Sequence, residues 1–263
     1  MSFSPTLQCC FLLLGGLLSI RAEPLFGLFT RRVKPGEYSF FVRLENVDSG
    51  MLCSGSLVSK RHVLTSAHCF KLQPNLKKIG VLLLDDAKKG VYKIESAVTY
   101  DQWSLLHREA HHFSDNDIAI AKLKEEVSEI EPATIKPIDP SQPHGVLKVV
   151  GWDIEDHEED DATPTILKVG FLKLMKKKDC QDSIRLISNE VENLENNILC
   201  TEGFPNAVLT CGDSGGPLLD SENRIVGITD SIYCAAVENK KMSTNVHIDI
   251  KYYARFIEQT TKS

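Results

Sequence analysis

The chain has 263 residues, of which 42% are hydrophobic, and this is enough for one large domain or for two small ones that share a core. Its formal net charge of -6 argues against a nucleic-acid partner, which would need a clustered basic surface. No segment approaches the roughly 18 consecutive apolar residues of a membrane span, so the sequence predicts none.

The N-terminal segment has the features of a secretory signal. Residues 9–20 form an uninterrupted apolar or small run that is too short to span a bilayer, and Arg21-Ala22 follows with a small residue suited to cleavage. We therefore predict a signal peptide over 1–22 and a secreted, extracellular protein. A buried core strand at the N-terminus is the alternative.

The cysteine count agrees with export. The chain has eight cysteines, and Cys9 and Cys10 fall within the predicted signal. The other six suit three disulfide bonds in an oxidising compartment, although the sequence leaves their pairing open. A structural metal site is the less favoured alternative, because closely spaced cysteine pairs are missing. The six are Cys53, Cys69, Cys180, Cys200, Cys211 and Cys234.

From about residue 38 onward, short apolar or alternating runs are separated by clusters of Gly, Pro, Asn and Asp, a pattern typical of an all-β sandwich or barrel. Apolar residues at helical spacing predict two helices that pack on the strands, over 177–188 and 250–260. The predicted strands are 38–45, 78–84, 91–100, 118–123, 147–152, 165–175, 225–229 and 245–250.

Two polar features are predicted to be solvated loops. Residues 153–161 hold seven acidic residues in nine, and their mutual repulsion favours an exposed loop over a metal site or a site for a basic partner. The pair His111-His112 is likewise predicted to lie in an exposed loop rather than to bind a metal. The sequence contains no Asn-x-Ser/Thr sequon, so N-glycosylation is not expected.

A glycine-rich segment carries a candidate nucleophile. Within residues 211–218, the hydroxyl of Ser214 lies between Gly212 and Gly215-Gly216. Glycines permit tight turns and bring backbone N–H groups close to a bound atom. Acyl transfer needs this combination, a nucleophile beside N–H donors for the developing oxyanion.

The nucleophile requires a base and a group that orients the base. His68, at the end of the segment 64–69, is the candidate base. Asp117, which opens the apolar run 118–123, is the candidate carboxylate that fixes the imidazole tautomer. Each feature alone is weak, and their coincidence carries the hypothesis.

Together these two segments resemble those of the trypsin-like (chymotrypsin-family) serine peptidases, and the resemblance extends from about Leu25 to the end. The chain order His, Asp, Ser also agrees and differs from that of subtilisins and α/β-hydrolases. The resemblance implies an all-β fold of two antiparallel six-stranded Greek-key barrels with a C-terminal helix. It also implies that His68, Asp117 and Ser214 form a catalytic triad, with the N–H groups of Gly212 and Ser214 as the oxyanion hole.

The resemblance also assigns the cysteines and the acidic loop. Gly151-Trp152 matches the family's turn ahead of the autolysis loop, which identifies the acidic run as that loop. The implied bridges are Cys53–Cys69, Cys180–Cys200 and Cys211–Cys234.

Family members are activated by a cut whose new terminal amine pairs with the aspartate before the nucleophile, here Asp213. The loosely matching terminus is Leu25, preceded by Pro24 rather than by Arg or Lys. We therefore predict a peptidase domain over 25–263 and a short propeptide, 23–24, that an X-Pro dipeptidyl peptidase would remove. Cleavage after Arg31 or Arg32 is the alternative.

The specificity pocket implied by the resemblance contains no charged residue. Val208, Leu209 and Thr210 lie near its base, and Ile232 and Asn245 occupy wall positions that are glycine in the family. An Arg or Lys side chain would lack a counter-ion there, so trypsin-like cleavage is not expected. The β-branched Ile232 predicts a preference for small aliphatic side chains.

The wall segment also departs from the family near the triad. The usual Ser-Trp pair is Asp230-Ser231 here. In the family that Ser supports the triad aspartate, so a carboxylate at this position is expected to repel Asp117.

The sequence therefore predicts a secreted serine endopeptidase, a monomer that needs no metal or organic cofactor. Its partners would be protein or peptide substrates and serpin-type inhibitors, with no membrane or nucleic-acid partner. The alternative is a weakly active or non-catalytic homologue that binds a protein partner. A disulfide-stapled structural domain would explain the cysteines but not the triad.

Overall fold

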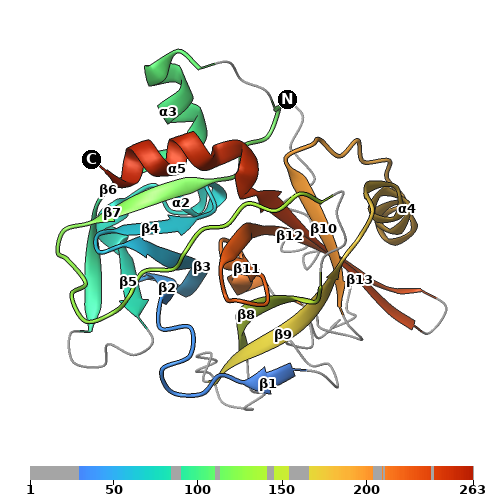
Figure 1. The fold of residues 1–263 in the computed structure, drawn as a ribbon, viewed down its shortest axis with the longest axis horizontal. Helices are drawn as coiled ribbons and strands as arrows, with labels where there is room; N and C mark the ends of the chain where they lie inside the picture. Colours follow the sequence, from blue (N-terminus) through green and yellow to red (C-terminus); the bar gives the residue numbers. More distant parts are fainter. Residues whose placement is uncertain are drawn as a thin grey trace.

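The computed structural model of the chain describes residues 30–83, 90–109, 113–140, 145–153, 166–203, 209, 211–237 and 240–262 (Figure 1). Several predicted features lie outside the described residues. They are the signal peptide 1–22, the dipeptide 23–24, Leu25, the pair His111-His112, the acidic loop beyond residue 153, Val208 and Thr210.

The first half of the chain forms a closed six-stranded barrel in the order β2-β3-β4-β7-β6-β5. Neighbouring strands are antiparallel. Successive side chains of a strand point alternately into and out of the barrel. In β6, Tyr92 and Ile94 are buried, whereas Val91 and Lys93 are exposed. The strands are β2 (Phe41–Asn46), β3 (Gly50–Ser59), β4 (His62–Thr65), β5 (Ile79–Leu83), β6 (Val91–Thr99) and β7 (Ala119–Leu123).

The second half forms another closed barrel, in the order β9-β10-β13-β12-β11-β8, which the pairing of β8 with β9 closes. The N-terminal strand β1 (Thr30–Arg32) adds to β9. The predicted all-β fold of two antiparallel six-stranded barrels is confirmed. The strands are β8 (Leu147–Asp153), β9 (Ile166–Leu174), β10 (Ile198–Gly203), β11 (Pro217–Leu219), β12 (Ile225–Val237) and β13 (Lys240–Asp249).

The helices are short and lie on the barrels. The predicted helix 177–188 is α4 (Lys177–Ser188), and the predicted C-terminal helix is a 3-10 turn, η5 (Ile250–Tyr253), followed by α5 (Ala254–Thr261). None of the helices within the described ranges is long and apolar enough to cross a membrane. The others are α2 (His68–Leu72), α3 (Tyr100–His107), η3 (Leu76–Lys78) and η4 (Cys211–Asp213).

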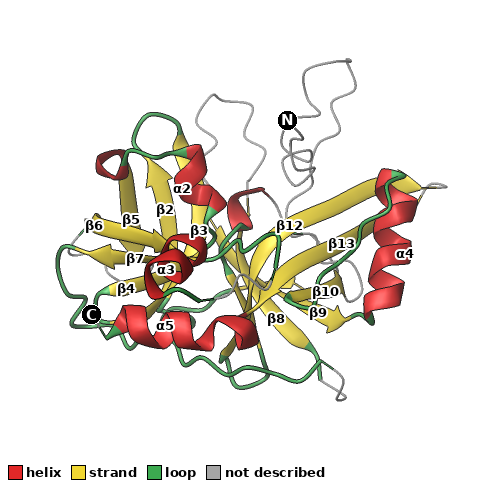
Figure 2. Cartoon of the chain, turned by 90° about the horizontal axis from the view of Figure 1, so that it is seen from above, coloured by secondary structure: helices red, strands yellow, loops and turns green. Residues whose placement is uncertain are grey.

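One hydrophobic cluster joins the two barrels and the C-terminal helix. It combines Phe41 and Ile120 of the first barrel with Ile228 and Ile248 of the second, and all four are almost fully buried. Phe256 of α5 belongs to the same cluster, and α5 packs against α3 and β7. Figure 2 shows the barrels side by side with α5 along one edge. The shared core fixes the relative position of the residues that the two barrels carry.

Candidate active site

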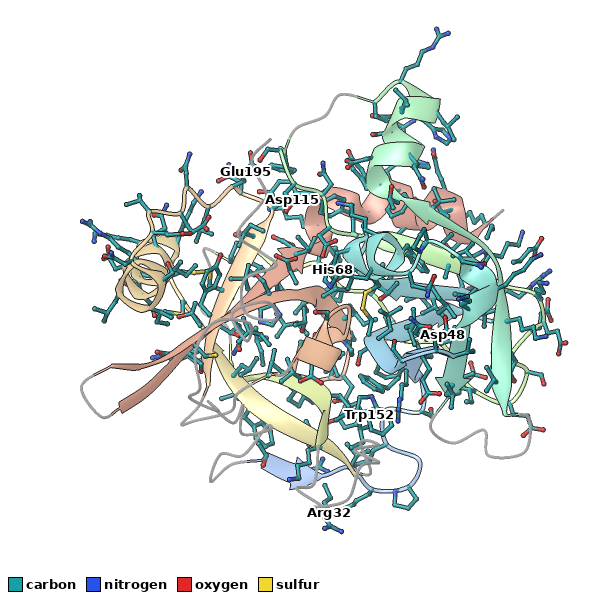
Figure 3. All side chains as sticks on the ribbon, turned by 180° about the vertical axis from the view of Figure 1, so that it is seen from behind. Arg32, Asp48, His68, Asp115, Trp152 and Glu195 are labelled. Atoms are coloured by element: carbon teal, nitrogen blue, oxygen red, sulfur yellow. A yellow bond between two sulfur atoms is a disulfide. The ribbon has the colours of Figure 1, made fainter. Side chains whose placement is uncertain are left out.

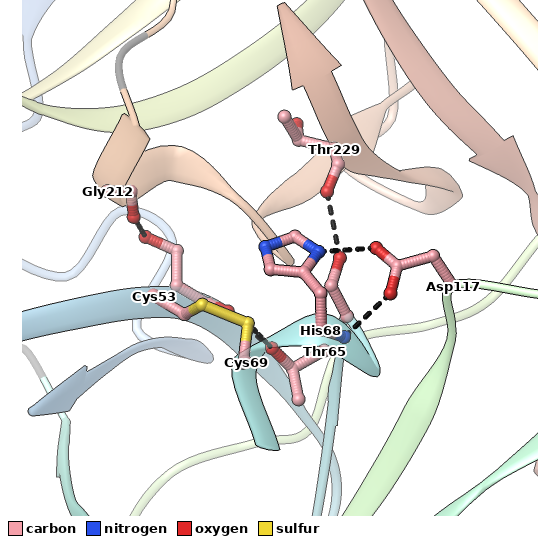
Figure 4. The surroundings of a disulfide bond; sticks show 9 residues. Cys53, Thr65, His68, Cys69, Asp117, Gly212 and Thr229 are labelled. Atoms are coloured by element: carbon pink, nitrogen blue, oxygen red, sulfur yellow. Dashed lines mark hydrogen bonds and ion pairs between the residues drawn. A yellow bond between two sulfur atoms is a disulfide. The ribbon is translucent and has the colours of Figure 1, made fainter. Parts of the chain in front are cut away.

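His68 is the first residue of α2, and a two-residue turn separates it from the end of strand β4; three contacts hold this turn (Figure 4). The Thr65 hydroxyl donates to the Ser54 carbonyl at 2.7 Å, and the Ser66 hydroxyl donates to the Thr229 carbonyl of β12 at 3.0 Å. A disulfide bond links the next residue, Cys69, to strand β3. The turn is thereby tied to both barrels.

Asp117 holds His68 by two hydrogen bonds. The His68 backbone N–H donates to Asp117 Oδ1 at 2.7 Å, and His68 Nδ1 lies 2.6 Å from Asp117 Oδ2. A carboxylate accepts hydrogen bonds, so Nδ1 carries the hydrogen. The other ring nitrogen, Nε2, is then the one available to accept a proton.

A buried network positions the loop that carries Asp117. The Tyr253 hydroxyl donates to Asn116 Oδ1 at 3.0 Å, and Asn197 Nδ2 donates to the Tyr253 oxygen at 2.8 Å. Asn197 Nδ2 also lies 2.9 Å from the carbonyl oxygen of Asp115. Figure 3 shows Asp115 near His68. Asn197, which directly precedes β10, and Tyr253 of η5 therefore anchor this loop, and the sequence identified neither of them as a residue of the site.

The electrostatics of the pair match this geometry. Burial lowers the pKa of His68, but the hydrogen bond and charge of Asp117 outweigh burial and leave that pKa above its ordinary value. Burial raises the pKa of Asp117, but the hydrogen bonds and charge of His68 outweigh burial and hold it below the usual range. The pair therefore favours an ionised Asp117 and a histidine that accepts protons readily.

Backbone contacts hold the loop of Ser214 on the first barrel. The Ser54 backbone N–H donates to the Ser214 carbonyl at 2.8 Å, and the Ser54 hydroxyl donates to the Gly212 carbonyl at 2.9 Å. Gly215 has a φ of +80°, and a Cβ there would collide with Thr65 Oγ1 and the Ser54 carbonyl. Within the described part of the chain, no hydrogen bond joins Ser214 to His68. Sequence reasoning missed Ser54, whose only signal is its position beside Cys53.

Asp213, which precedes the nucleophile, is almost fully buried. Its Oδ1 accepts a hydrogen bond from the Trp152 backbone N–H at 3.1 Å, and a Cβ on Gly151 would lie 2.5 Å from the same oxygen. The predicted partner, the amine of Leu25, lies outside the described residues. The activation ion pair therefore stays a prediction.

Three of the predicted specificity residues lie close together in the second barrel. Leu209 and Ile232 belong to one hydrophobic cluster. Asn245 of β13 is the cross-strand partner of Ile232 of β12. Asn245 is fully buried, and neither polar atom of its amide has a hydrogen-bond partner among the residues that the structure describes.

Asp230 is brought next to the proposed triad. Its carboxyl group lies beside that of Asp117, because the two carboxyls and the His68 ring present ligand atoms within 4.8 Å of one another. The carboxyl that was expected to repel Asp117 therefore lies close to it. These three groups could ligate a metal ion, but in this arrangement they are occupied with one another. A second cluster combines His68 with Cys53 and Cys69, whose thiols are consumed by a disulfide.

Two of the three implied disulfide bonds are present, Cys53–Cys69 and Cys180–Cys200. The third, Cys211–Cys234, stays a prediction because the Cys211 side chain is not among the described ones.

The comparison with known families agrees with the fold. The model of the family named Trypsin matches residues 28–257. The chain belongs to the trypsin family. The fold inferred from the His68 and Ser214 segments is therefore that of a serine protease family.

The relatives within the trypsin family are distant. The human (Homo sapiens) atrial natriuretic peptide-converting enzyme is 24% identical over 246 residues, which cover 87% of this chain and 22% of that protein. Granzyme M of Rattus norvegicus is 28% identical over 208 residues, which cover 75% of each chain. This chain thus spans about a fifth of the length of the converting enzymes.

A solved structure shows the same fold. Neuropsin, a serine protease expressed in the limbic system of mouse brain, superposes with a TM-score of 0.66 at 21% sequence identity. The match covers 88% of this chain and 98% of neuropsin. At this identity the likeness supports the fold alone.

Proposed function

We propose that this trypsin-family chain is a serine endopeptidase that works through an acyl-enzyme. The observation that carries the proposal is the His68–Asp117 pair, with its 2.6 Å contact between Nδ1 and Oδ2. Because Asp117 occupies Nδ1, Nε2 of His68 would take the proton of the Ser214 hydroxyl as its oxygen attacks the substrate carbonyl carbon. His68 would then protonate the leaving amine, and water would hydrolyse the acyl-enzyme in a second step with the same base.

The developing oxyanion needs donors close to the nucleophile. The backbone N–H groups of Gly212 and Ser214 are the proposed donors, and the Ser54 contacts to both carbonyls support this role by holding the loop on the first barrel. The carbonyl oxygens are engaged by Ser54. Preorganised donors of this kind stabilise the transition state because they need not reorient during the reaction.

The proposed substrates are peptides with a small, uncharged side chain before the cleaved bond. Leu209 and Ile232 support this proposal, since they pack in one apolar cluster and bring no charge. A buried Lys or Arg side chain without a counter-ion is strongly unfavourable. Serpin-type inhibitors would engage the same site, and no metal or organic cofactor takes part in the proposed chemistry.

Secretion and N-terminal processing belong to the same proposal. The two disulfide bonds support an oxidising compartment. We expect the secreted chain to begin at Leu25, where its new amine would reach Asp213. Intact-mass analysis of the secreted protein tests this, and a mature chain that starts elsewhere would contradict it.

Labelling by a fluorophosphonate probe tests the activity itself. The secreted, processed protein should be labelled at Ser214, and both Ser214→Ala and His68→Ala should abolish labelling. Peptide-library hydrolysis by the processed protein that has not been exposed to the probe then measures the side-chain preference. A processed wild-type chain that takes up no probe would overturn the endopeptidase proposal.

A further inference from the structure

Asp230 lies at an irregular point of strand β12, beside the triad. The pairing of β12 with β13 runs from Thr229 opposite His247 to Ser231 opposite Val246, so Asp230 is an extra residue in the strand. Bulges of this kind re-aim a side chain and are frequent next to active sites. Here the carboxyl of Asp230 lies within 4.8 Å of the ligand atoms of Asp117 and His68, and the whole residue is only 9% exposed.

The hydrogen bonds around the two carboxyl groups indicate which of them is ionised and which holds a proton. Two buried carboxyl groups this close together repel strongly when both are ionised, so one of them is expected to hold a proton, which it can donate to the other. Both oxygens of Asp117 accept from His68, through its backbone N–H and Nδ1, and accepting these bonds favours the ionised form. Asp117 is therefore the anion, and Asp230 is the group left to hold the proton.

We propose that Asp230 is a positioning residue of the triad, which holds a proton at working pH and donates it to Asp117. This inference rests on the proposed function, because it concerns the same His68–Asp117 pair. In this arrangement a single negative charge faces His68, and the Asp117 carboxylate is held by a donor from each barrel. The Ser231 hydroxyl also donates to Asp230, at 3.3 Å from Oδ2.

The surroundings of Asp230 favour its protonated form. Burial raises the pKa of Asp230 well above its ordinary value, and the negative charges of Asp117 and Asp115 raise it further. The hydrogen bond from Ser231 opposes this shift. His68 faces the cluster from the first barrel, and Lys71 of the same helix acts on the pKa of His68.

This arrangement makes a specific prediction about pH. Because the pKa of Asp230 is raised, the proton is held below that pKa and is lost as the pH rises through it. Its loss removes the donor to Asp117 and places two anions side by side. We therefore expect kcat/KM to fall on the alkaline side of the pH profile with an ionisation that belongs to Asp230.

Two substitutions separate this role from a general structural one. In Asp230→Asn the amide N–H can still donate to Asp117 but cannot ionise, so activity should stay close to wild type and the alkaline fall due to Asp230 should disappear. In Asp230→Ala the donor is lost, and kcat should fall about 10- to 100-fold, the effect expected for a hydrogen bond to a charged group. Asp182→Asn, on the exposed face of α4, is the control for a change in net charge.

A readout independent of catalysis completes the test. In Ser214→Ala protein at neutral pH, difference infrared spectroscopy should show a protonated carboxylic acid that is absent from the same protein with Asp230→Asn. Identical spectra, or an Asp230→Asn variant as impaired as Asp230→Ala, would overturn the proposal. Thermal unfolding of every variant identifies any that fails to fold. If the infrared band is present but wild type is not labelled by the probe, the positioning role of Asp230 stands and the endopeptidase proposal fails.

Discussion

On the first barrel, His68 is held by side chains, whereas on the second barrel the loop of Ser214 is held by backbone groups. Two oxygens of Asp117 and a disulfide at Cys69 fix the histidine. The serine loop is fixed by carbonyls that accept from Ser54 and by glycines without room for a side chain.

The two halves of the site are therefore sensitive to different kinds of substitution. The orientation of the base depends on single side chains, which can be replaced one at a time without changing the course of the chain. The position of the nucleophile depends on the shape of the backbone, so it responds to substitutions that add atoms to a glycine. Substitutions in the two halves should therefore affect activity and stability in different proportions.

The largest effect is expected for Asp117→Asn, on the base side. The amide can present its N–H to His68 Nδ1, which would leave the wrong imidazole tautomer, and kcat should fall roughly 10,000-fold. Because Asp117 raises the pKa of His68, the acid limb of kcat/KM should also move to lower pH. Steady-state kinetics between about pH 5 and about pH 10, a range that includes the ordinary histidine pKa of about 6.5, would measure both the fall in kcat and the shift of the acid limb.

The comparison between Asp117→Asn and wild type requires an unchanged fold. Circular dichroism and the unfolding midpoint should remain near wild type, because the substitution keeps the shape of the side chain. If Asp117→Asn retained most of the wild-type kcat, the assignment of Asp117 as the orienting group would be wrong.

The next largest effect is expected for the removal of a disulfide bond. Each barrel has one such bond among the described residues, so the two removals can be compared. Cys53–Cys69 and Cys180–Cys200 close segments of similar length, with separations of 16 and 20 residues. Removing either bridge by a double Cys→Ala substitution should lower the free energy of unfolding by about 3 kcal/mol. Denaturant unfolding in the absence of reductant measures this.

Only the first bridge should also change catalysis. Cys69 follows His68 directly, whereas Cys180 is in α4, on the far side of the second barrel from α2 (Figures 1 and 2). Under conditions where both variants are folded, loss of Cys53–Cys69 should lower kcat and loss of Cys180–Cys200 should not. Equal activity losses would show that the bridges act through global stability alone.

The sequence predicts the parts of this molecule that are encoded within a few adjacent residues. The segments around His68 and Ser214 could be identified because their chemistry is local. The helix Lys177–Ser188 was predicted with the bounds that the structure shows, because its apolar residues repeat at helical spacing. Strand β3 was missed because the small residues 54–56, two serines and a glycine, interrupt its apolar pattern, and β11 was missed because it has only three residues.

Features that depend on distant partners could not be predicted. One local signal was also missed: the capping box of Thr99 and Gln102 starts α3 at Tyr100, whereas the apolar run predicted a strand that continued to that residue. The hydrogen bond between Tyr253 and Asn116 joins residues that are far apart in the chain. The re-aiming of Asp230 toward Asp117 depends on the register of β12 against β13, which no local pattern records.

On the nucleophile side, Gly215→Ala should destabilise the protein more than a comparable change elsewhere. Gly36 has nearly the same φ, +81° against +80°, but a Cβ on it would meet nothing within 4 Å. Gly36→Ala therefore measures the left-handed backbone alone, about 1 kcal/mol. Gly215→Ala adds the collision with Thr65 and Ser54, and we expect about 1–2 kcal/mol more. Equal unfolding free energies in urea for the two variants would contradict this close approach, and probe labelling of Ser214 should drop only in Gly215→Ala.

The smallest effect is expected for Tyr253→Phe, which tests whether the base side is also held from the second barrel. The substitution removes the hydroxyl that joins Asn116 to Asn197, and the lost hydrogen bonds should lower the free energy of unfolding by about 1 kcal/mol. Tyr252→Phe, at an exposed neighbouring tyrosine, is the matched control and should change little. Because Asn116 precedes Asp117, a looser loop should lower kcat while KM stays near wild type. A loss of stability without any change in kcat would show that α2 and the His68–Asp117 bonds alone are enough to position the base.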